Sequence, residues 1–480
     1  MFVKNFANLF FCCKMKIDFI KILMKEQNST TEKNIAGQND NGHVNGNDKI
    51  IEPKKFLFVA LEALSGDLAW QLKKEGHEVK MYMKAKSVAD VYNGFIDKVD
   101  NWESYKDWAD VIVFDDMEFG EIADKLRKNG KLVIGGSVYT DRLEMDRDFG
   151  QTELKKYGIN ILPQWQFTNY DEAIDFIEKN PERYVFKPGG NVPSSGKELS
   201  FLGQEEDGKD LLEFLKQNQN VLAKKVPFFQ LQKFVSGVEI AVGAFFNGKD
   251  FILPINVNFE HKRIFPGDIG PLSGEMGTLM FWSEPNKLFK MTLEKMKPVL
   301  IESGYIGYID INCIVNGKGI YPLEWTTRFG YPTIQIQSEG IMMPTGEWLY
   351  KLARGESFEL KTKKGFQVGV RIMVPTVFAS AKDKELIEIY RDLPILFKKL
   401  GNLDGVHIED VKMEDGVWRI AGDSGCLLVV TGSGTTVAEA RQQAYTRIKN
   451  IMVQNMFYRT DIGLKWHTDS DKLQTWGYLY

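Results

Sequence analysis

The sequence contains little cysteine and little net charge, and each shortage excludes a class of protein. Four cysteines occur in 480 residues, with the spacing of neither metal ligands nor a disulfide framework: Cys12, Cys13, Cys313 and Cys426. This usage predicts a reducing compartment, the cytoplasm. A formal charge of -4 argues against nucleic-acid partners and a basic membrane surface. Lysines also interrupt the apolar residues of segment 2–24, which lacks a membrane-spanning run. We therefore expect small-molecule substrates.

The chain is too long for one ordinary core, and two to four domains are expected. Residues 27–48 are rich in Asn, Gly, Thr and Gln, which predicts a disordered linker. The segment before it fits a cleaved signal, a loose amphipathic arm, or an extension upstream of a true start at Met24. The predicted division is an N-terminal arm (1–54), domains at 55–140, 141–360 and 361–465, and a tail (466–480).

The order of apolar segments predicts a multidomain protein of mixed α/β and α+β class. Short apolar strands alternate with helical segments between 56 and 134, which is typical of a small parallel α/β domain. Single helices are expected at 142–156 and 286–303. Strand-like segments and a final helix predict a small C-terminal antiparallel-sheet domain, with strands at 366–374, 405–412, 417–421 and 426–431 and the helix at 436–451.

The most informative segment is 260–277, which combines glycines and prolines with cations, including Lys262 and Arg263. This composition permits neither a helix nor a long strand. A hairpin turning at Asn247-Gly248 is expected before it and the helix at 286–303 after it. The segment is therefore predicted to be a loop held at both ends, with the cations and glycines needed to close over phosphate.

Two weaker signals lie upstream of this loop. Lys187 ends an apolar strand and precedes the small-residue segment 188–197, which could close over a polyphosphate or be a plain surface hairpin. Residues 231–239 join an extended stretch to a strand that begins near Glu239. Such a connector could offer its backbone to adenine and its carboxylate to ribose, although a glutamate on a solvated strand is the simpler reading.

The strongest constellation is a predicted hairpin that turns at Asn316-Gly317. Asn312 and Glu324 lie on its two strands, and strand alternation places Glu324, Thr326 and Arg328 on one face. Oxygen ligands beside a phosphate-binding cation suit Mg²⁺, which takes few protein carboxylates. Asp310 shares a face with Asn312 and could add charge. A solvated face of charged residues is the alternative.

In their order along the chain, these elements resemble the ATP-grasp superfamily. Segments 260–263 and 267–277 resemble the Asp-His-Lys-Arg and Gly-Asp-Thr-Gly-Pro-Asn-Thr-Gly-Gly-Met-Gly loop of the phosphoribosylamine-glycine ligase (glycinamide ribonucleotide synthetase) family. Segment 328–330 resembles the start of its Arg-Phe-Gly-Asp-Pro-Glu motif, and segments 431–441 and 459–463 resemble its C-terminal domain. The likeness spans roughly residues 55 to 463. It implies an ATP-grasp core between the parallel N-terminal domain and the antiparallel C-terminal domain.

The resemblance implies that ATP phosphorylates the carboxylate of glycine and that phosphoribosylamine attacks the acyl phosphate, as a step of purine biosynthesis. ATP with Mg²⁺ or Mn²⁺ would be the cofactors, and the protein would be a monomer or homodimer. Arg328, Lys262 and Arg263 would lie at the substrates, and Glu324, Asn312 and Thr326 at the metal. The nucleotide would be held by Arg147, Lys187, Gly196, Gln232, Val235 and Glu239.

Departures from the family pattern gather where substrates bind. The turn that carries Gly-Gly-Arg-Glu-His in the family reads Leu61-Glu-Ala-Leu-Ser-Gly-Asp67 here, without arginine. Thr326 stands at a metal-binding Asn, Arg147 at a Lys, and Glu275 at a Gly. Two further hypotheses therefore stay open: an ATP-grasp ligase that uses another amine, or a catalytically silent homologue that binds nucleotide.

Overall fold

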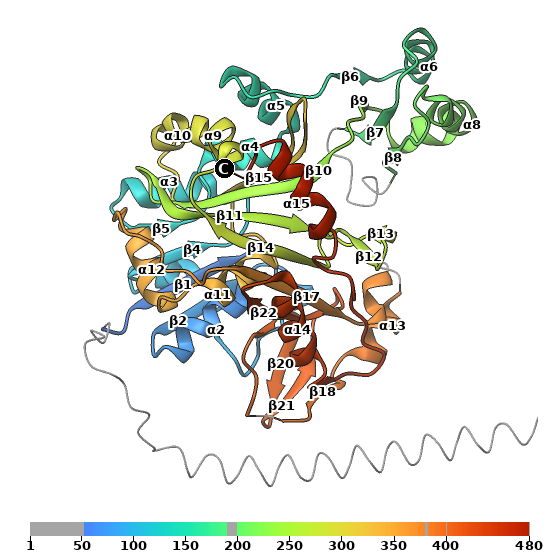
Figure 1. Ribbon diagram of the computed structural model, residues 1–480. Coiled ribbons are helices and arrows are strands. Elements are labelled where there is room, and N and C mark those ends of the chain that lie inside the picture. Colours follow the sequence, from blue (N-terminus) through green and yellow to red (C-terminus); the bar gives the residue numbers. More distant parts are fainter. Residues whose placement is uncertain (1–51, 190–198, 380–382, 400, 480) are drawn as a thin grey trace, which may run out of the picture.

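The computed structural model describes residues 52–189, 199–379, 383–399 and 401–479 (Figure 1). The predicted N-terminal arm lies outside these residues except for its last three, and Gly196 also lies outside them. In the described part of the chain, no helix is long and apolar enough to cross a membrane.

The first domain is a five-stranded parallel sheet in the order β3-β2-β1-β4-β5, as the alternating pattern predicts. Its central strand is buried along almost its whole length because helices cover the sheet. The elements are β1 (Lys55–Ala60), α2 (Gly66–Lys74), β2 (Glu78–Met83), β3 (Asp97–Lys98), β4 (Val111–Phe114), α3 (Gly120–Lys128) and β5 (Leu132–Ile134).

Two helices predicted as continuous are each divided in the structure. The segment predicted at 142–156 forms α4 (Val138–Met145) and α5 (Arg147–Lys156), because Asp146 leaves helical geometry and accepts a hydrogen bond from the Phe149 amide at 3.0 Å. The segment predicted at 286–303 forms α9 (Lys287–Met291) and α10 (Leu293–Glu302), with the break at Thr292.

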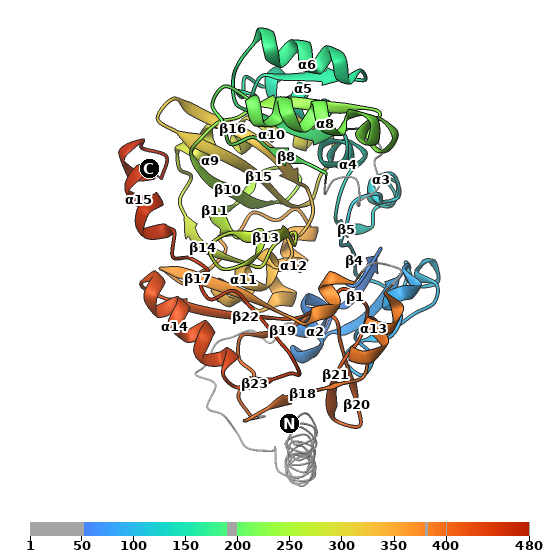
Figure 2. The ribbon, with the colours of Figure 1, turned by 90° about the vertical axis from the view of Figure 1, so that its right-hand side faces the viewer.

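A small layer with its own apolar core projects from the rest of the molecule (Figures 1 and 2). Its antiparallel sheet has the order β6-β9-β7-β8. The elements are β6 (Gln164–Phe167), α6 (Tyr170–Lys179), β7 (Tyr184–Pro188), β8 (Phe201–Leu202), α8 (Lys209–Lys225) and β9 (Phe229–Lys233).

The centre of the molecule is an eight-stranded antiparallel sheet in the order β16-β15-β10-β11-β14-β17-β22-β19. Both predicted hairpins are present, since Phe246 pairs with Phe251 and Asn312 pairs with Glu324. The strands are β10 (Val238–Phe246), β11 (Phe251–Glu260), β14 (Gly277–Ser283), β15 (Gly307–Asn316), β16 (Gly319–Thr326), β17 (Phe366–Met373), β19 (Val406–Ile408) and β22 (Cys426–Gly434).

The predicted C-terminal strands divide between two sheets. β17 pairs with both β14 and β22, so it continues the central sheet. The strand predicted at 405–412 is two strands, β19 in the central sheet and β20 in a separate sheet of order β20-β21-β18-β23. That sheet consists of β18 (Pro394–Phe397), β20 (Val411–Glu414), β21 (Val417–Ile420) and β23 (Ile451–Met452).

The remaining elements surround the central sheet. The loop at 260–277 contains no long strand, as predicted, but folds as a short hairpin of β12 (Arg263–Phe265) and β13 (Ile269–Leu272). Helix α14 (Val437–Ile448) begins with a capping box between Thr436 and Glu439. The other helices are α11 (Thr333–Gly340), α12 (Thr345–Ala353), α13 (Lys384–Tyr390) and α15 (Trp466–Thr475).

Candidate active site

The ammonium group of Lys262 lies among three carboxylates from three neighbouring segments of the central sheet. Its Nζ is 2.5 Å from Glu324, 3.3 Å from Glu239 and 3.5 Å from Glu260. The order β16-β15-β10-β11 brings these side chains together, because Glu324 is on β16, Glu239 on β10 and Glu260 at the end of β11. One cation therefore faces three carboxyl groups.

Asn312 lies on β15 within this cluster, opposite Glu324. Its Nδ2 donates to Glu239 at 3.1 Å and to Glu260 at 3.2 Å. Its buried Oδ1 has no hydrogen-bond partner within the part of the chain that the structure describes. A buried amide oxygen left without a donor is costly, so this atom is suited to a ligand.

The electrostatics of the cluster favour additional positive charge. Lys262 lowers the pKa of Glu324, whereas burial raises the pKa of Glu260 well above its ordinary value. Burial alone would lower the pKa of Lys262, but Glu324 and Glu260 outweigh it, so the lysine stays charged. With a free amide oxygen beside excess carboxylate charge, these residues fit a hard cation such as Mg²⁺.

Lys187 ends β7 and is also close to this cluster. Its Nζ donates to Oε1 of Gln232 on the adjacent strand β9 at 2.5 Å. Burial, reinforced by the charges of Arg147 and Lys262, lowers the pKa of Lys187 to about 8. Cations gathered closely enough to lower the pKa of Lys187 are suited to a polyanion.

A cavity of about 670 Å³ opens between the small layer and the central sheet. The predicted connector forms one wall, and β7 and the end of β11 form others. Four of the predicted nucleotide residues line it, together with Glu260 of the carboxylate cluster: Lys187, Gln232, Val235 and Glu239. The space thus extends from the connector to the cation cluster.

A second cavity, of about 450 Å³, shares Leu323 with the first as a lining residue. Three of the predicted site residues line it: Arg147, Glu324 and Arg328. The guanidinium of Arg328 lies 3.5 Å from Asp116 and 3.5 Å from Glu144. Glu144, on α4, is a site residue that the sequence reasoning missed, because nothing in its local pattern separates it from a solvated helix face.

Two predicted residues have other contacts in this structure. The Arg263 guanidinium donates to the Gly270 carbonyl within the β12–β13 hairpin. Thr326 lies opposite Asp310 and hydrogen-bonds to its carboxylate. Asp310 also accepts from the Tyr308 hydroxyl at 3.1 Å, and burial raises its pKa to about 7. The metal-binding role of Thr326 and the substrate role of Arg263 therefore stay predictions.

The turn at 61–67 is filled from inside the first domain. The Tyr92 hydroxyl donates to the Ala63 carbonyl at 2.7 Å, and a Cβ on Gly66 would lie 2.1 Å from the Tyr92 ring. Ser65 donates to Asp115 at 2.6 Å, and burial raises the pKa of Asp115 to about 8. Asp67 is buried as well, accepting from the Ile408 amide at 3.0 Å. The turn is therefore acidic and tightly packed.

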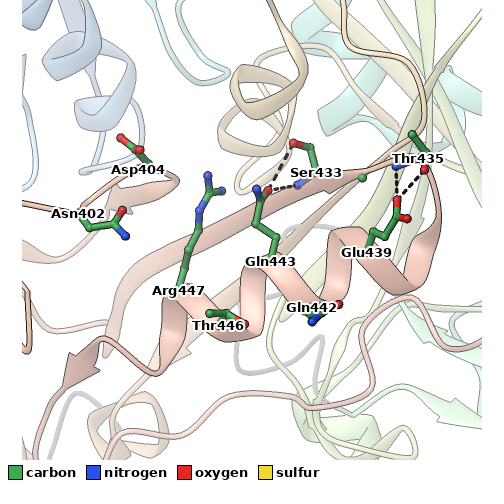
Figure 3. A pocket seen from close by; sticks show the side chains of 10 residues that line it. Asn402, Asp404, Ser433, Thr435, Glu439, Gln442, Gln443, Thr446 and Arg447 are labelled. Atoms are coloured by element: carbon green, nitrogen blue, oxygen red, sulfur yellow. Dashed lines mark hydrogen bonds between the residues drawn. The ribbon is translucent and has the colours of Figure 1, made fainter.

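A larger hollow, of about 740 Å³, lies away from these residues, between β22, α14 and segment 402–404 (Figure 3). Two pairs of its polar groups bond to each other: Gln443 accepts from the Ser433 amide, and Glu439 accepts from the Thr435 hydroxyl. Its cation, Arg447, already pairs with Glu339 at 2.8 Å. These satisfied groups make it a poorer candidate site than the Lys262 cluster.

Comparison with known proteins identifies two matched regions. The model of the phosphoribosylglycinamide synthetase ATP-grasp (A) domain matches residues 145–334, and that of the C domain matches residues 403–465. The first region contains the whole carboxylate cluster. This match begins at residue 145, beyond the turn at 61–67.

Similar full-length proteins carry a related name. A phosphoribosylamine–glycine ligase of Helicobacter pylori is 29% identical over 365 residues, covering 72% of this chain and 79% of that relative. One of Clostridium acetobutylicum is 25% identical over 363 residues, covering 71% and 81%. The crystal structure of the ligase from Thermotoga maritima superposes with a TM-score of 0.63 at 21% identity, covering 85% of this chain and all of that one. This last likeness supports the fold.

Proposed function

Because the chain is an ATP-grasp protein similar to the phosphoribosylglycinamide synthetases, we propose that it is an ATP-dependent ligase that joins glycine to phosphoribosylamine through an acyl phosphate. The observation that carries the proposal is the juxtaposition of Lys187, Lys262, Asn312 and Glu324 beside two adjoining cavities. Cations for a triphosphate and oxygens for a divalent metal then share one space.

The cavity of about 670 Å³ beside the connector is suited to the nucleotide. Lys187 and Arg147 would bind its phosphates, while the backbone of Gln232 and Val235 would contact adenine. Glu239 would accept from the ribose hydroxyls, since its side chain is 44% exposed at the cavity. Gly196 would complete the phosphate side.

The carboxylate cluster is suited to the metal. Glu324 and the free Oδ1 of Asn312 would be its protein ligands, with Thr326 beside them. ATP and Mg²⁺, when bound, supply the phosphoryl group and the charge that neutralises it. Lys262 would turn from Glu324 to the transferring phosphoryl group, which exchanges this ion pair for a contact with developing negative charge.

The second cavity is suited to the substrates. Arg328 would hold the carboxylate of the amino acid, because its guanidinium lies at the cavity between two carboxylates that keep it oriented. Lys262 and Arg263 would lie beside the acyl group as it forms. Binding both substrates in a fixed geometry reduces the entropic cost of their reaction.

One observation favours a second candidate, a ligase that uses an amine without a ribose phosphate. The turn at 61–67, which stands where the resembling family binds phosphoribosylamine, contains no arginine but includes Glu62 and buried Asp67. The carboxylates of Glu62 and Asp67 would repel a phosphate dianion. A cationic amine would meet no such repulsion.

ADP release tests both candidates. The full chain would be supplied with Mg²⁺ and ATP, and then with glycine alone, glycine plus fresh phosphoribosylamine, or other pairs of amino acid and amine. Turnover that requires glycine and phosphoribosylamine together supports the first candidate. Turnover with another pair alone supports the second, and ATP binding without turnover on any pair would indicate a silent homologue.

We expect the affinity for ATP to fall by about tenfold as the pH rises from 7 to 9.5, because Lys187 loses its proton near pH 8 and with it a charged hydrogen bond. The Lys187 amine is charged below its pKa and neutral above it, so ATP should bind most strongly below about pH 8. Titration of ATP at a series of pH values measures the effect.

The matched control is Lys187→Met, which should bind ATP more weakly and show a much flatter pH profile. Asp115, whose pKa is also about 8, is retained in this variant. An equally steep profile in Lys187→Met would assign the pH dependence to Asp115 or another group and contradict the prediction.

A further inference from the structure

Helix α15 forms part of the wall of the nucleotide cavity. Gly463, Lys465, Trp466, Thr468 and Asp469 line this cavity together with the connector at 233–239. Figure 1 shows α15 lying across the central sheet beside β10 and β15. The C-domain match ends at residue 465, so this helix lies beyond both matched regions.

The first residue of α15 is anchored in the sheet. The Trp466 ring makes edge contacts with Phe259 on β11 and Phe281 on β14, at centroid distances of 5.3 and 5.5 Å. It contacts Phe366 on β17 at 5.3 Å in the same way. Aromatic packing of this kind stabilises the helix in one position against three strands.

The end of the chain is anchored near the connector. The Tyr478 hydroxyl donates to the Asn316 carbonyl at 2.9 Å, and the Asn316 amide donates to the Ser236 carbonyl at 2.8 Å. Ser236 belongs to the connector that lines the cavity. The helix is therefore held at both ends and presents a fixed surface to the nucleotide.

Asp469 is the carboxylate on that surface, and its side chain is 18% exposed. Lys472, at 3.6 Å, is its ion-pair partner on the same helix. The phosphates of a nucleotide would lie at the other end, where Lys187 and Lys262 gather positive charge. A carboxylate beside the base accepts hydrogen bonds but repels a carbonyl oxygen.

We propose that α15 is a wall of the nucleotide site and that Asp469 selects a base with an exocyclic amino group. Adenine carries that donor, whereas hypoxanthine carries a carbonyl at the same position. The inference rests on the proposed nucleotide site and adds to it a specificity residue from the end of the chain. Trp466 holds the helix against the central sheet, and Asp469 accepts a hydrogen bond from the amino group of the base.

Binding of ATP and ITP to the full chain tests the proposal by isothermal titration calorimetry. The wild type should prefer ATP, and Asp469→Ala should reduce the ratio of the two affinities by about tenfold, because one charged hydrogen bond is lost. Asp469→Asn carries both an acceptor oxygen and an NH2 donor that can pair with the hypoxanthine carbonyl, so it should also lose the preference. The matched control is Asp471→Ala, which removes an exposed carboxylate from the same helix.

An unchanged ratio in Asp469→Ala would overturn the proposal while leaving the nucleotide site intact, provided that the wild type binds ATP. An equal loss in Asp471→Ala would also overturn it, since the effect would then be one of helix charge. Failure of the wild type to bind ATP would overturn both this inference and the proposed function.

Discussion

We expect Glu324→Ala to lower the turnover number by about 10³-fold, a loss typical of removing one group that stabilises a transition state electrostatically. Glu324 is a predicted metal ligand, and it pairs with Lys262 at 2.5 Å. Without it, the metal would lose its main carboxylate, and Lys262 would be drawn toward Glu239 and Glu260. Steady-state ADP release with saturating ATP measures the change.

The fold should survive this substitution. The Glu324 side chain is 55% exposed, and Lys262 keeps two carboxylate partners, at 3.3 and 3.5 Å, so no buried charge is left alone. Glu284→Ala, which removes an exposed carboxylate after β14, is the matched control and should turn over normally. Turnover of Glu324→Ala within threefold of this control would contradict the assignment.

The Asn312–Glu324 pair was predictable because its information is local. Alternating apolar residues on both sides of Asn316-Gly317 specify a hairpin, and the turn fixes which residues face each other. The same pattern of apolar residues on both sides of a turn predicts the hairpin at Asn247-Gly248, which the structure contains. Short-range pairing alone therefore places Asn312 opposite Glu324, at the centre of the candidate site.

The partners of Lys262 were not predictable in the same way. Glu239 and Glu260 reach Lys262 only because β10 lies next to β15 in the central sheet and β11 lies next to β10. Strand order depends on packing among distant segments, which a single sequence does not display. The free Oδ1 of Asn312 is a consequence of the same arrangement, since Nδ2 is taken by those two glutamates.

Helix breaks and sheet membership were missed for related reasons. Apolar periodicity continues through Asp146, but its side chain competes for the backbone and starts a new helix. Segment 366–374 has the pattern of an antiparallel strand, and that pattern fits a separate C-terminal sheet as well as the central sheet that β17 joins. Segment 466–480 shows little apolar periodicity apart from its aromatic residues, so its place beside the nucleotide cavity has no local signal.

The other large effect concerns stability, and we expect Arg459→Ala to lower the free energy of unfolding by about 3–5 kcal/mol. The Arg459 side chain is 0% exposed and pairs with Asp461 at 2.6 Å and Asp268 at 2.8 Å. It also donates to the Arg263 carbonyl at 2.9 Å. Its removal would leave Asp461 without its paired cation and Asp268 with Lys465 alone, and it would release the β12–β13 hairpin beside Lys262. Urea denaturation measures the loss.

Arg354→Ala is the matched control, because its pair with Glu356 is at the surface and should contribute at most about 1 kcal/mol.

The pH dependence of the free energy of unfolding gives a second test. Burial alone would raise the pKa of Asp461, but Arg459 and the Gly267 amide outweigh it and lower the pKa to about 2. This stabilisation is present above the ordinary value of 3.8 and is lost as the pH falls toward 2. The difference between wild type and Arg459→Ala should therefore shrink over that range, and a constant difference would show that packing, rather than the ion pair, holds the hairpin.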